Sequence, residues 1–149
     1  MYKKILVPVE NSPYDDAIVD HVLELAKITG SSVVLIHVAD GWAARNISQL
    51  KLRESEEMKK DREYIENLAE EITSKGVEAE ALLASGDPAT EISQAAARED
   101  CDLIAMSTHG HKFIGDMIHG SVSHGVRHAS HIPVLLVRGS AQGRVGKVK

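Results

Sequence analysis

The chain has 149 residues, of which 43% are hydrophobic and 26% are charged, and it contains one Trp and one Phe. This is the composition of an ordinary folded domain and excludes a disordered chain, and a domain of this length buries about two thirds of its unfolded surface without a disulfide. The net charge of −5 argues against a nucleic-acid partner, because non-specific binding to nucleic acid is driven by Lys and Arg that displace counterions from the phosphates.

Five short aliphatic segments alternate with helical patterns along the chain. They are residues 5–9, 33–38, 77–83, 103–106 and Val134–Val137. Runs of β-branched residues of this length are typical of strands buried on both faces of a sheet. Because each connection is long enough for a parallel crossover, the pattern predicts an open, doubly wound α/β fold, with a parallel five-stranded sheet and helices on both faces.

Capping residues mark the ends of the predicted helices. Ser12 is placed to cap the first helix, Pro13 fits its first position and Asp15 complements its N-terminal dipole, while Gly30 ends it. The other helices are expected after a loop at residues 41–48, at Asp87-Pro88 and after Gly120. We interpret Asp87 as a helix cap rather than as a ligand.

Few features of the sequence bear on the location of the protein. The lone Cys101 cannot form an internal disulfide, and a free thiol suits a reducing compartment. The apolar run after Lys3 and Lys4 is interrupted by Pro8 and ends at Glu10, so it is too short for a signal peptide or a membrane span. We therefore expect a cytoplasmic protein without membrane insertion.

The carboxyl ends of the first and fourth predicted strands are where a ligand of an open parallel sheet would bind. Glu10 follows the first strand, and after the fourth strand nine residues separate Gly110 from Gly120-Ser121. Glycines let backbone amides approach phosphate oxygens, and a helix that starts after Gly120 adds unpaired N–H groups and a positive dipole end. The same two glycines fit a helix C-cap and a turn, so the spacing leaves both a phosphate site and a structural role open.

Several short segments follow one another in a fixed order. They read Ile-Leu-Val-Pro-Val-Glu-Asn-Ser-Pro at 5–13, Ile-His-Val at 36–38, Gly-Asp-Pro at 86–88, Gly at 110, Gly-Ser-Val-Ser at 120–123, Arg-His at 127–128 and Ile-Pro-Val at 132–134. With these segments the chain resembles the universal stress protein family, and more closely its ATP-binding branch, over nearly all of residues 2–138. The combination in this order is highly specific.

The resemblance implies a domain at residues 1–139 with the adenine nucleotide alpha hydrolase-like fold and strand order 3-2-1-4-5. Residues 140–149 are Gly-rich, basic and without an apolar pattern, which indicates a flexible tail. It also implies ATP as the ligand, with Mg²⁺ as a reasonable companion but without a dedicated carboxylate cage. The residues that it assigns are Val38 and Met106 beside the adenine, Pro8, Val9 and Glu10 at the ribose, and Ser107, Gly110, Gly120, Ser121 and Val122 at the phosphates.

Two positions depart from the family's nucleotide motif, which is Gly, two residues, Gly, nine residues, Gly, then Ser or Thr. Ser107 stands where the family has its first glycine, and Glu10 where it usually has Asp. If position 107 needs a left-handed backbone, or if its Cβ crowds the phosphates, serine lowers the affinity, whereas its hydroxyl can also donate to them. The carboxylate of Glu10 can still accept from ribose hydroxyls.

The resemblance favours a nucleotide-binding stress-response regulator whose assembly or partner contacts depend on the nucleotide. An enzyme is disfavoured, because the chain lacks a GxxxxGK[ST] loop and a clear set of base, nucleophile and metal-binding carboxylates, although slow ATP hydrolysis stays open. Another alternative is a family member with a vestigial crevice whose dimer surface carries the function, for which Ser107 is the best support. A flavin role is the least favoured, since the chain has little aromatic surface.

Six of the eight histidines lie between His109 and His131, and His124 and His128 are four residues apart. We interpret them as solvated helix residues rather than as a metal site, because a transition metal needs three or four converging ligands and no Cys or HExxH pattern is present. Lys112 lies in the glycine loop, where it fits either a phosphate contact or a surface position.

The last predicted strand bears on assembly. In the order 3-2-1-4-5, Val134–Val137 is an apolar strand at the edge of the sheet, and such an edge invites pairing with another chain. We expect a homodimer formed by antiparallel pairing of this strand with its copy.

Overall fold

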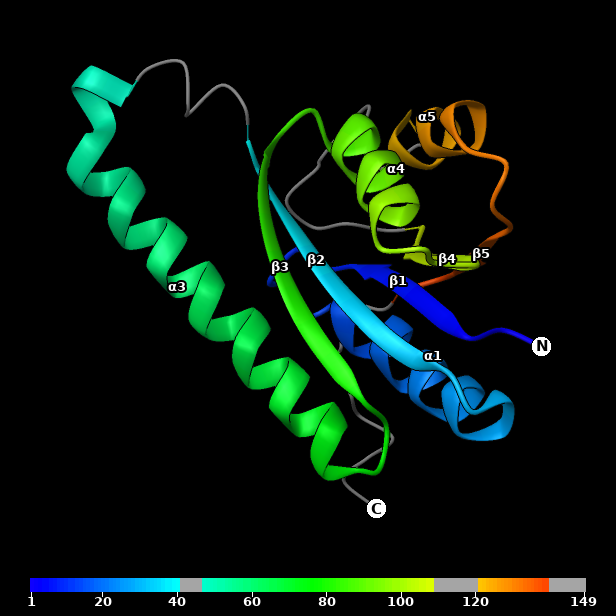
Figure 1. Cartoon of the computed structure of the whole chain (residues 1–149). Coiled ribbons are helices and arrows are strands. Elements are labelled where there is room, and N and C mark those ends of the chain that lie inside the picture. Colours follow the sequence, from blue (N-terminus) through cyan, green and yellow to red (C-terminus); the bar gives the residue numbers. More distant parts are fainter. Residues whose placement is uncertain (41–46, 109–120, 140–149) are drawn as a thin grey trace.

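A parallel five-stranded sheet runs through the centre of the molecule (Figure 1). The computed structural model describes residues 1–40, 47–108 and 121–139. The strands are β1 (Lys4–Pro8), β2 (Ser32–Asp40), β3 (Ala79–Gly86), β4 (Leu103–Ser107) and β5 (Val134–Val137), and the helices are α1 (Asp15–Thr29), α3 (Ile47–Ser74), α4 (Pro88–Arg98) and α5 (Ser121–Ala129). The strand order β3-β2-β1-β4-β5, with every pair parallel, confirms the predicted doubly wound topology.

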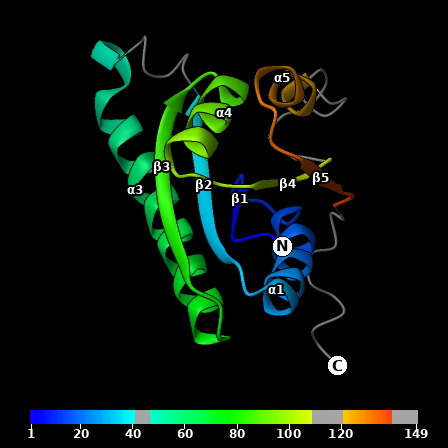
Figure 2. The same ribbon diagram turned by 45° about the vertical axis from the view of Figure 1, so that its right-hand side comes forward.

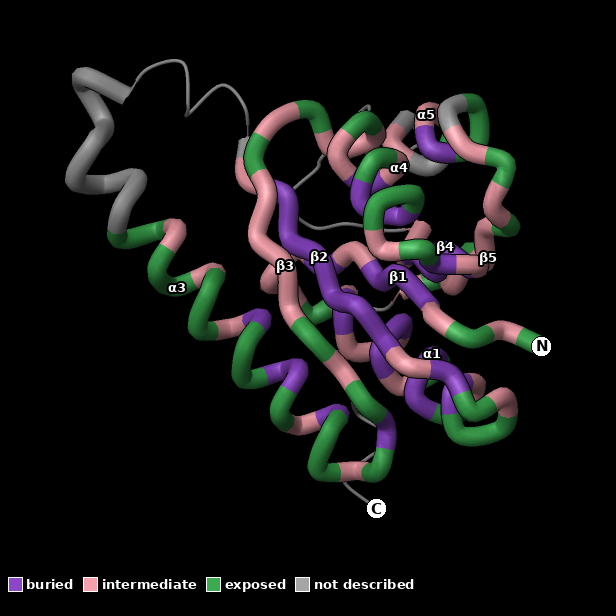
Figure 3. Tube along the Cα trace, viewed as in Figure 1, coloured by how far each residue is buried: buried purple, intermediate pink, exposed green. Residues whose placement is uncertain are grey.

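Helices cover both faces of this sheet (Figure 2). Helices α1 and α3 pack on one face, where their apolar residues join Ile5, Val7 and Leu35 in one cluster. Helices α4 and α5 pack on the other face, around Leu6 and Ile36. Successive side chains of a strand point to opposite sides, so the central strands are buried on both faces (Figure 3), which explains the continuous apolar runs in the sequence.

Helix α3 is the longest helix in the described part of the chain and lies beside β3 (Figure 1). It begins at Ile47, so residues 47 and 48 belong to the helix and not to the predicted loop, because Ile47 and Leu50 continue the apolar spacing of the helix. The remainder of that loop, residues 41–46, lies outside the described residues. The residues of α3 that face the core are Ile65, Leu68, Ala69 and Ile72. Within the described ranges, no helix combines the length and the apolarity that crossing a membrane requires.

The ends of four strands differ from the prediction. Strand β2 covers Ser32–Asp40 rather than residues 33–38, and β4 ends at Ser107 rather than at residue 106. Strand β3 covers Ala79–Gly86 rather than residues 77–83, because the chain first completes a turn at Gly76, whose φ is 95°. Val9 falls outside β1, yet its N–H still donates to the carbonyl of Ile36 at 2.9 Å and its side chain is buried. Apolar runs therefore predict the core of this protein better than they predict the last residue of a strand.

The start of helix α1 differs from the prediction as well. The helix begins at Asp15, Tyr14 occupies the N-cap position without a side-chain capping bond, and Pro13 lies in the turn before the helix. The prediction that Ser12 caps the helix is wrong, because the carboxylate of Asp15 instead accepts the backbone N–H of Ser12 at 3.1 Å. The predicted end of the helix at Gly30 is confirmed by its left-handed φ of 73°.

Helices α4 and α5 approach each other closely on the second face. Asp87 caps α4 as predicted, since its carboxylate accepts the N–H of Thr90 at 3.0 Å. In α5, a Cβ atom added at Gly125 would lie 2.7 Å from the Cβ of Ala89. Two carbon atoms do not approach to that distance without a clash, so the absence of a side chain at Gly125 sets the spacing between the two helices.

We expect Gly125→Ala to lower the free energy of unfolding by about 1–3 kcal/mol, because the added methyl group forces α4 and α5 apart. The higher helix propensity of Ala acts in the opposite direction by up to about 1 kcal/mol, so a net loss is diagnostic of the clash. Urea denaturation measures the difference. Adding Ala89→Gly removes the opposing methyl group and should recover part of the lost stability, whereas a Gly125→Ala protein as stable as the wild type contradicts the close contact.

Candidate functional site

Three residues predicted to contact a nucleotide belong to one apolar cluster. Val38 lies near the end of β2 and Met106 near the end of β4, and both side chains are buried, at 9% and 5% exposure. Val122, in the first turn of α5, packs against the same cluster. The structure therefore groups the two residues predicted at the adenine with one of those predicted at the phosphates, at the carboxyl ends of the strands.

The three residues predicted at the ribose lie where the strand order reverses. Pro8 ends β1, which lies between β2 and β4, so the loop after it opens at the switch point of the sheet. Val9 is buried, and Glu10 is half-buried, with its Oε2 accepting the hydroxyl of Ser12 at 3.1 Å. This places a carboxylate at the position where a doubly wound sheet binds its ligand.

The residues predicted at the phosphates are described only in part. Gly110, Gly120 and Lys112 lie outside the described residues. Ser121 is the first residue of α5, and its backbone is described but its side chain is not. The phosphate side of the site therefore rests on the sequence motif.

Ser107 is the last residue of β4 and pairs with Val137 of β5. Among the described residues, the non-glycine residues with a left-handed backbone are Asn11 and Asp100, so Ser107 adopts no such conformation. A Cβ atom at Gly139 would lie 2.7 Å from the Oγ of Ser107, which places this hydroxyl against the segment that follows β5. The backbone at position 107 therefore accepts serine as readily as glycine.

A buried carboxylate organises the loop after β1. Asp15 is 2% exposed. Its carboxylate accepts three consecutive backbone N–H groups, from Glu10 at 2.9 Å, Asn11 at 2.8 Å and Ser12 at 3.1 Å. The hydroxyl of Tyr64 in α3 donates to the same carboxylate at 2.6 Å. Four donors compensate the desolvation of one charge, and the loop backbone is fixed as a result.

A second polar pair, of the buried His37 and the half-buried Asp61, connects β2 and α3 to this loop. Nε2 of His37 lies 3.1 Å from Oδ2 of Asp61, and Nδ1 of the same ring lies 3.0 Å from the carbonyl oxygen of Val9. The other carboxylate oxygen of Asp61 accepts the side-chain amide of Asn11 at 3.3 Å. Sequence reasoning did not identify these residues as part of the site. The available signal was a histidine inside an otherwise apolar strand.

A family model described as the universal stress protein family matches residues 1–138. The chain belongs to the universal stress protein family. Among its relatives, universal stress protein YxiE of Bacillus subtilis is 30% identical over 148 residues, which cover 93% of this chain and 100% of that protein. Universal stress protein MJ0577 of Methanocaldococcus jannaschii is 30% identical over 158 residues, which cover 93% of this chain and 96% of that protein.

Solved structures of the family share the fold. The structure of MJ0577 is 30% identical in sequence and has a TM-score of 0.77, covering 94% of this chain and 98% of its own. A universal stress protein from Archaeoglobus fulgidus in complex with dAMP is 21% identical, with a TM-score of 0.66 and coverage of 92% and 98%. A further universal stress protein, in complex with cAMP, is 18% identical, with a TM-score of 0.64 and coverage of 93% and 98%.

The histidines of this universal stress protein are separated by the fold. His37 is buried in β2, whereas His124 and His128 are exposed on α5, with their rings edge to face at a centroid distance of 4.5 Å. His109 and His111 lie outside the described residues. In the described part of the chain, no three His, Cys, Asp or Glu side chains are grouped so that they could hold a metal ion.

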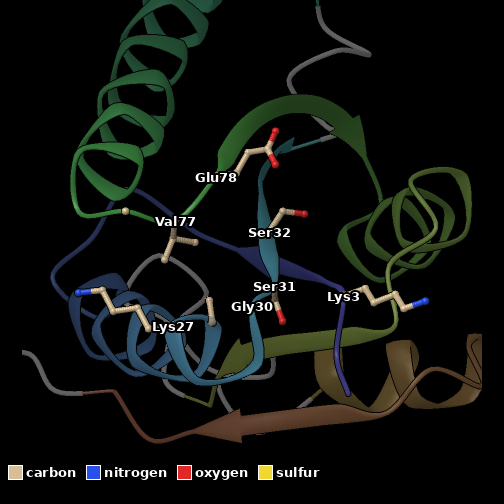
Figure 4. Close-up of a pocket in the computed structure, with 9 residues that line it drawn as sticks. Lys3, Lys27, Gly30, Ser31, Ser32, Val77 and Glu78 are labelled. Carbon is tan, nitrogen blue, oxygen red and sulfur yellow. The ribbon is translucent and has the colours of Figure 1, made fainter.

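A surface cavity of about 420 Å³ lies at the other end of the sheet, where β2 and β3 begin (Figure 4). Its lining includes Lys3, Lys27 and Ser31. In Figure 4 the two lysine side chains extend in opposite directions, and the hydroxyl of Ser31 donates to the carbonyl of Tyr2 at 2.6 Å. The charged groups of Lys3 and Lys27 therefore do not converge on one point of this cavity (Figure 4).

Cys101 is buried just before β4, and burial raises the pKa of its thiol to about 11. At pH 8, about one thiol in a thousand is then ionised, and the thiolate is the reactive form. We expect iodoacetamide to alkylate the native protein about 100-fold more slowly than the urea-unfolded chain, as measured by mass spectrometry. Equal rates in the two states would contradict the buried, neutral thiol.

Proposed function

We propose that this universal stress protein binds ATP in the crevice at the carboxyl ends of β1, β2 and β4, and acts as a cytoplasmic stress-response regulator through nucleotide-dependent assembly or partner binding. The observation that carries the proposal is that Val38, Met106 and Val122 share one apolar cluster, while Glu10 follows β1 at the point where the strand order reverses. An apolar pocket with a few fixed polar groups suits a flat purine attached to a polar sugar.

The proposal assigns a part of the nucleotide to each side of the crevice. The adenine contacts Val38 and Met106, and the ribose hydroxyls donate to Glu10 beside Pro8 and Val9. The phosphates bind to Ser107, Gly110, Gly120, Ser121 and Val122, where the N-terminus of α5 supplies unpaired N–H groups and a positive dipole end. The dAMP and cAMP complexes of two family structures support an adenine nucleotide as the ligand. Mg²⁺ accompanies the triphosphate in this proposal.

Calorimetric titration of the purified full-length chain with ATP and Mg²⁺ tests the proposal, with GTP as the control for the base. We expect saturable binding of ATP and a weaker response to GTP, because the apolar cluster accepts either purine but the fit to the ring edge differs. Absence of ATP binding at millimolar concentration would remove the proposal. The function would then lie in the dimer surface.

The proposed homodimer forms through β5. Among the described strands, β5 pairs with β4 and forms one edge of the sheet, and Leu136 on it is 39% exposed. An exposed apolar edge strand is stabilised when it pairs with another strand. Sedimentation equilibrium at micromolar concentration should give twice the mass of the chain, and Leu136→Lys should shift the protein toward the monomer. A wild-type monomer at that concentration contradicts the proposed assembly.

A further inference from the structure

Both chain neighbours of Glu10 are connected to the carboxylate of Asp61 in α3. On one side, Asp61 contacts the ring of His37, which contacts the carbonyl of Val9. On the other side, Asp61 accepts the side-chain amide of Asn11. Asn11 has a left-handed φ of 67°, a conformation that asparagine tolerates better than most residues. One side chain, remote in sequence, therefore holds both neighbours of the carboxylate that faces the proposed ribose.

The hydrogen-bonding requirements of this pair are specific. The ring of His37 spans two oxygen atoms, with Nδ1 at the carbonyl of Val9 and Nε2 at the carboxylate of Asp61. The side chains of His37 and Asp61 are 7% and 15% exposed, so water competes weakly for either group. A polar arrangement of this kind is favourable only when its geometry is well matched, and it then fixes the groups it contacts.

The apolar contacts of α3 with the sheet come from residues other than this pair. Ile65, Leu68 and Ile72, which follow Asp61 in the same helix, are buried against the sheet and supply the apolar contacts that hold α3 in place. The contacts of Asp61 are directed instead at the loop after β1, through His37 and Asn11. Asp61 therefore contributes to the structure of the loop after β1 rather than to the apolar packing of α3.

We propose that Asp61 is a positioning residue for Glu10, and that through His37 and Asn11 it gives the site its preference for nucleotides with ribose hydroxyls. This inference rests on the proposed function, since Glu10 is the group that accepts from the ribose. The carboxylate of Glu10 discriminates a hydroxyl from a hydrogen only if its backbone is held still, because a mobile acceptor loses the geometry on which its hydrogen bonds depend.

The test compares the affinities of the full-length protein for ATP and for 2′,3′-dideoxy-ATP, both with Mg²⁺, by calorimetry. In the wild type we expect ATP to bind at least about tenfold more tightly, as hydrogen bonds to a charged acceptor imply. In Asp61→Ala we expect the two affinities to differ by no more than about threefold. ATP should bind more weakly than to the wild type, and the affinity for the dideoxy nucleotide should change little. A defect in folding alone would lower the amount of active protein for both ligands and leave the ratio unchanged.

Two further variants sharpen the comparison. Asp61→Asn keeps an oxygen that accepts from Asn11 and offers an amide hydrogen to Nε2 of His37, so it should retain most of the discrimination. Glu66→Ala removes an exposed carboxylate from the same helix and should behave as the wild type. Loss of discrimination in Asp61→Ala, with retention in both other variants, supports positioning by Asp61.

The outcomes separate this inference from the proposed function. If the wild type binds neither nucleotide, the proposed function fails and the preference for ribose fails with it. If the wild type prefers ATP and Asp61→Ala keeps the full preference, or if the wild type binds both nucleotides equally, nucleotide binding stands and the inference is overturned. Without any nucleotide, hydrogen exchange of peptides that contain residues 9–12 should be faster in Asp61→Ala than in the wild type, and equal rates would overturn the positioning role by themselves.

Discussion

Replacing Asp15 by Ala is expected to lower the free energy of unfolding by about 3–5 kcal/mol. The substitution leaves three consecutive N–H groups, those of Glu10, Asn11 and Ser12, without their acceptor, and it leaves the hydroxyl of Tyr64 without its partner. Each buried donor that loses its acceptor costs about 1–3 kcal/mol, and water can reach only some of them. Urea denaturation followed by circular dichroism measures the loss.

Three variants control this expectation. Glu24→Ala removes an exposed carboxylate from the same helix and should change the stability by no more than about 0.5 kcal/mol. Tyr64→Phe removes one of the four donors and should cost about 1 kcal/mol. Asp15→Asn can still be measured if Asp15→Ala does not fold. Its loss of unfolding free energy should lie between the losses of Asp15→Ala and Tyr64→Phe. An Asp15→Ala protein as stable as Glu24→Ala contradicts the role of Asp15 in the loop.

The second large effect is expected at Gly120, where Gly120→Val should weaken ATP binding by at least about a hundredfold. In the proposed site, backbone amides at the start of α5 approach the phosphates closely, and a branched Cβ at this position occupies the same space as the phosphate oxygens. Since the binding contributions of the adenine and the ribose remain, the expected result is loss of affinity for ATP with a smaller loss for adenosine. Calorimetry with both ligands measures the difference.

Controls for Gly120→Val separate a blocked site from a damaged fold. Gly120→Ala adds a smaller group and should give an intermediate loss of affinity. Gly143→Val makes the same substitution outside the motif and should bind ATP as the wild type does. Unfolding midpoints of all three variants should stay close to one another. An unchanged affinity of Gly120→Val for ATP would show that the phosphates do not bind over this glycine.

The topology could be predicted from the sequence because the central strands β1, β2 and β4 are buried on both faces and read as apolar runs. The helix ends at Gly30 and Asp87 were equally predictable, since they depend on residues adjacent in the chain. The start of α1 was not predictable in this way, because the same segment fits two local structures. Ser12 fits a helix cap, but in the structure the carboxylate of Asp15 accepts the backbone N–H of Ser12 and α1 begins at Asp15.

The site was predictable only where it follows a motif. Val38 and Met106 were identified from the resemblance, and the structure groups them in one cluster. The polar residues behind the loop were missed because their partners lie far away in sequence. Tyr64 is 49 residues from Asp15, and Asp61 reads as one more acidic residue on a charged helix until α3 is docked against the sheet. No local pattern reveals which face of a solvated helix meets a loop.

The buried thiol described above has a practical consequence for following this protein in solution. Cys101 is the only cysteine of the chain, and both its burial and its raised pKa suppress its reaction. A cysteine introduced at an exposed position, such as Glu66 on α3, therefore becomes the single fast-reacting thiol without removal of the native one. A spin label or fluorophore placed there reports on the helix that carries Asp61 while the core of the domain keeps its natural sequence.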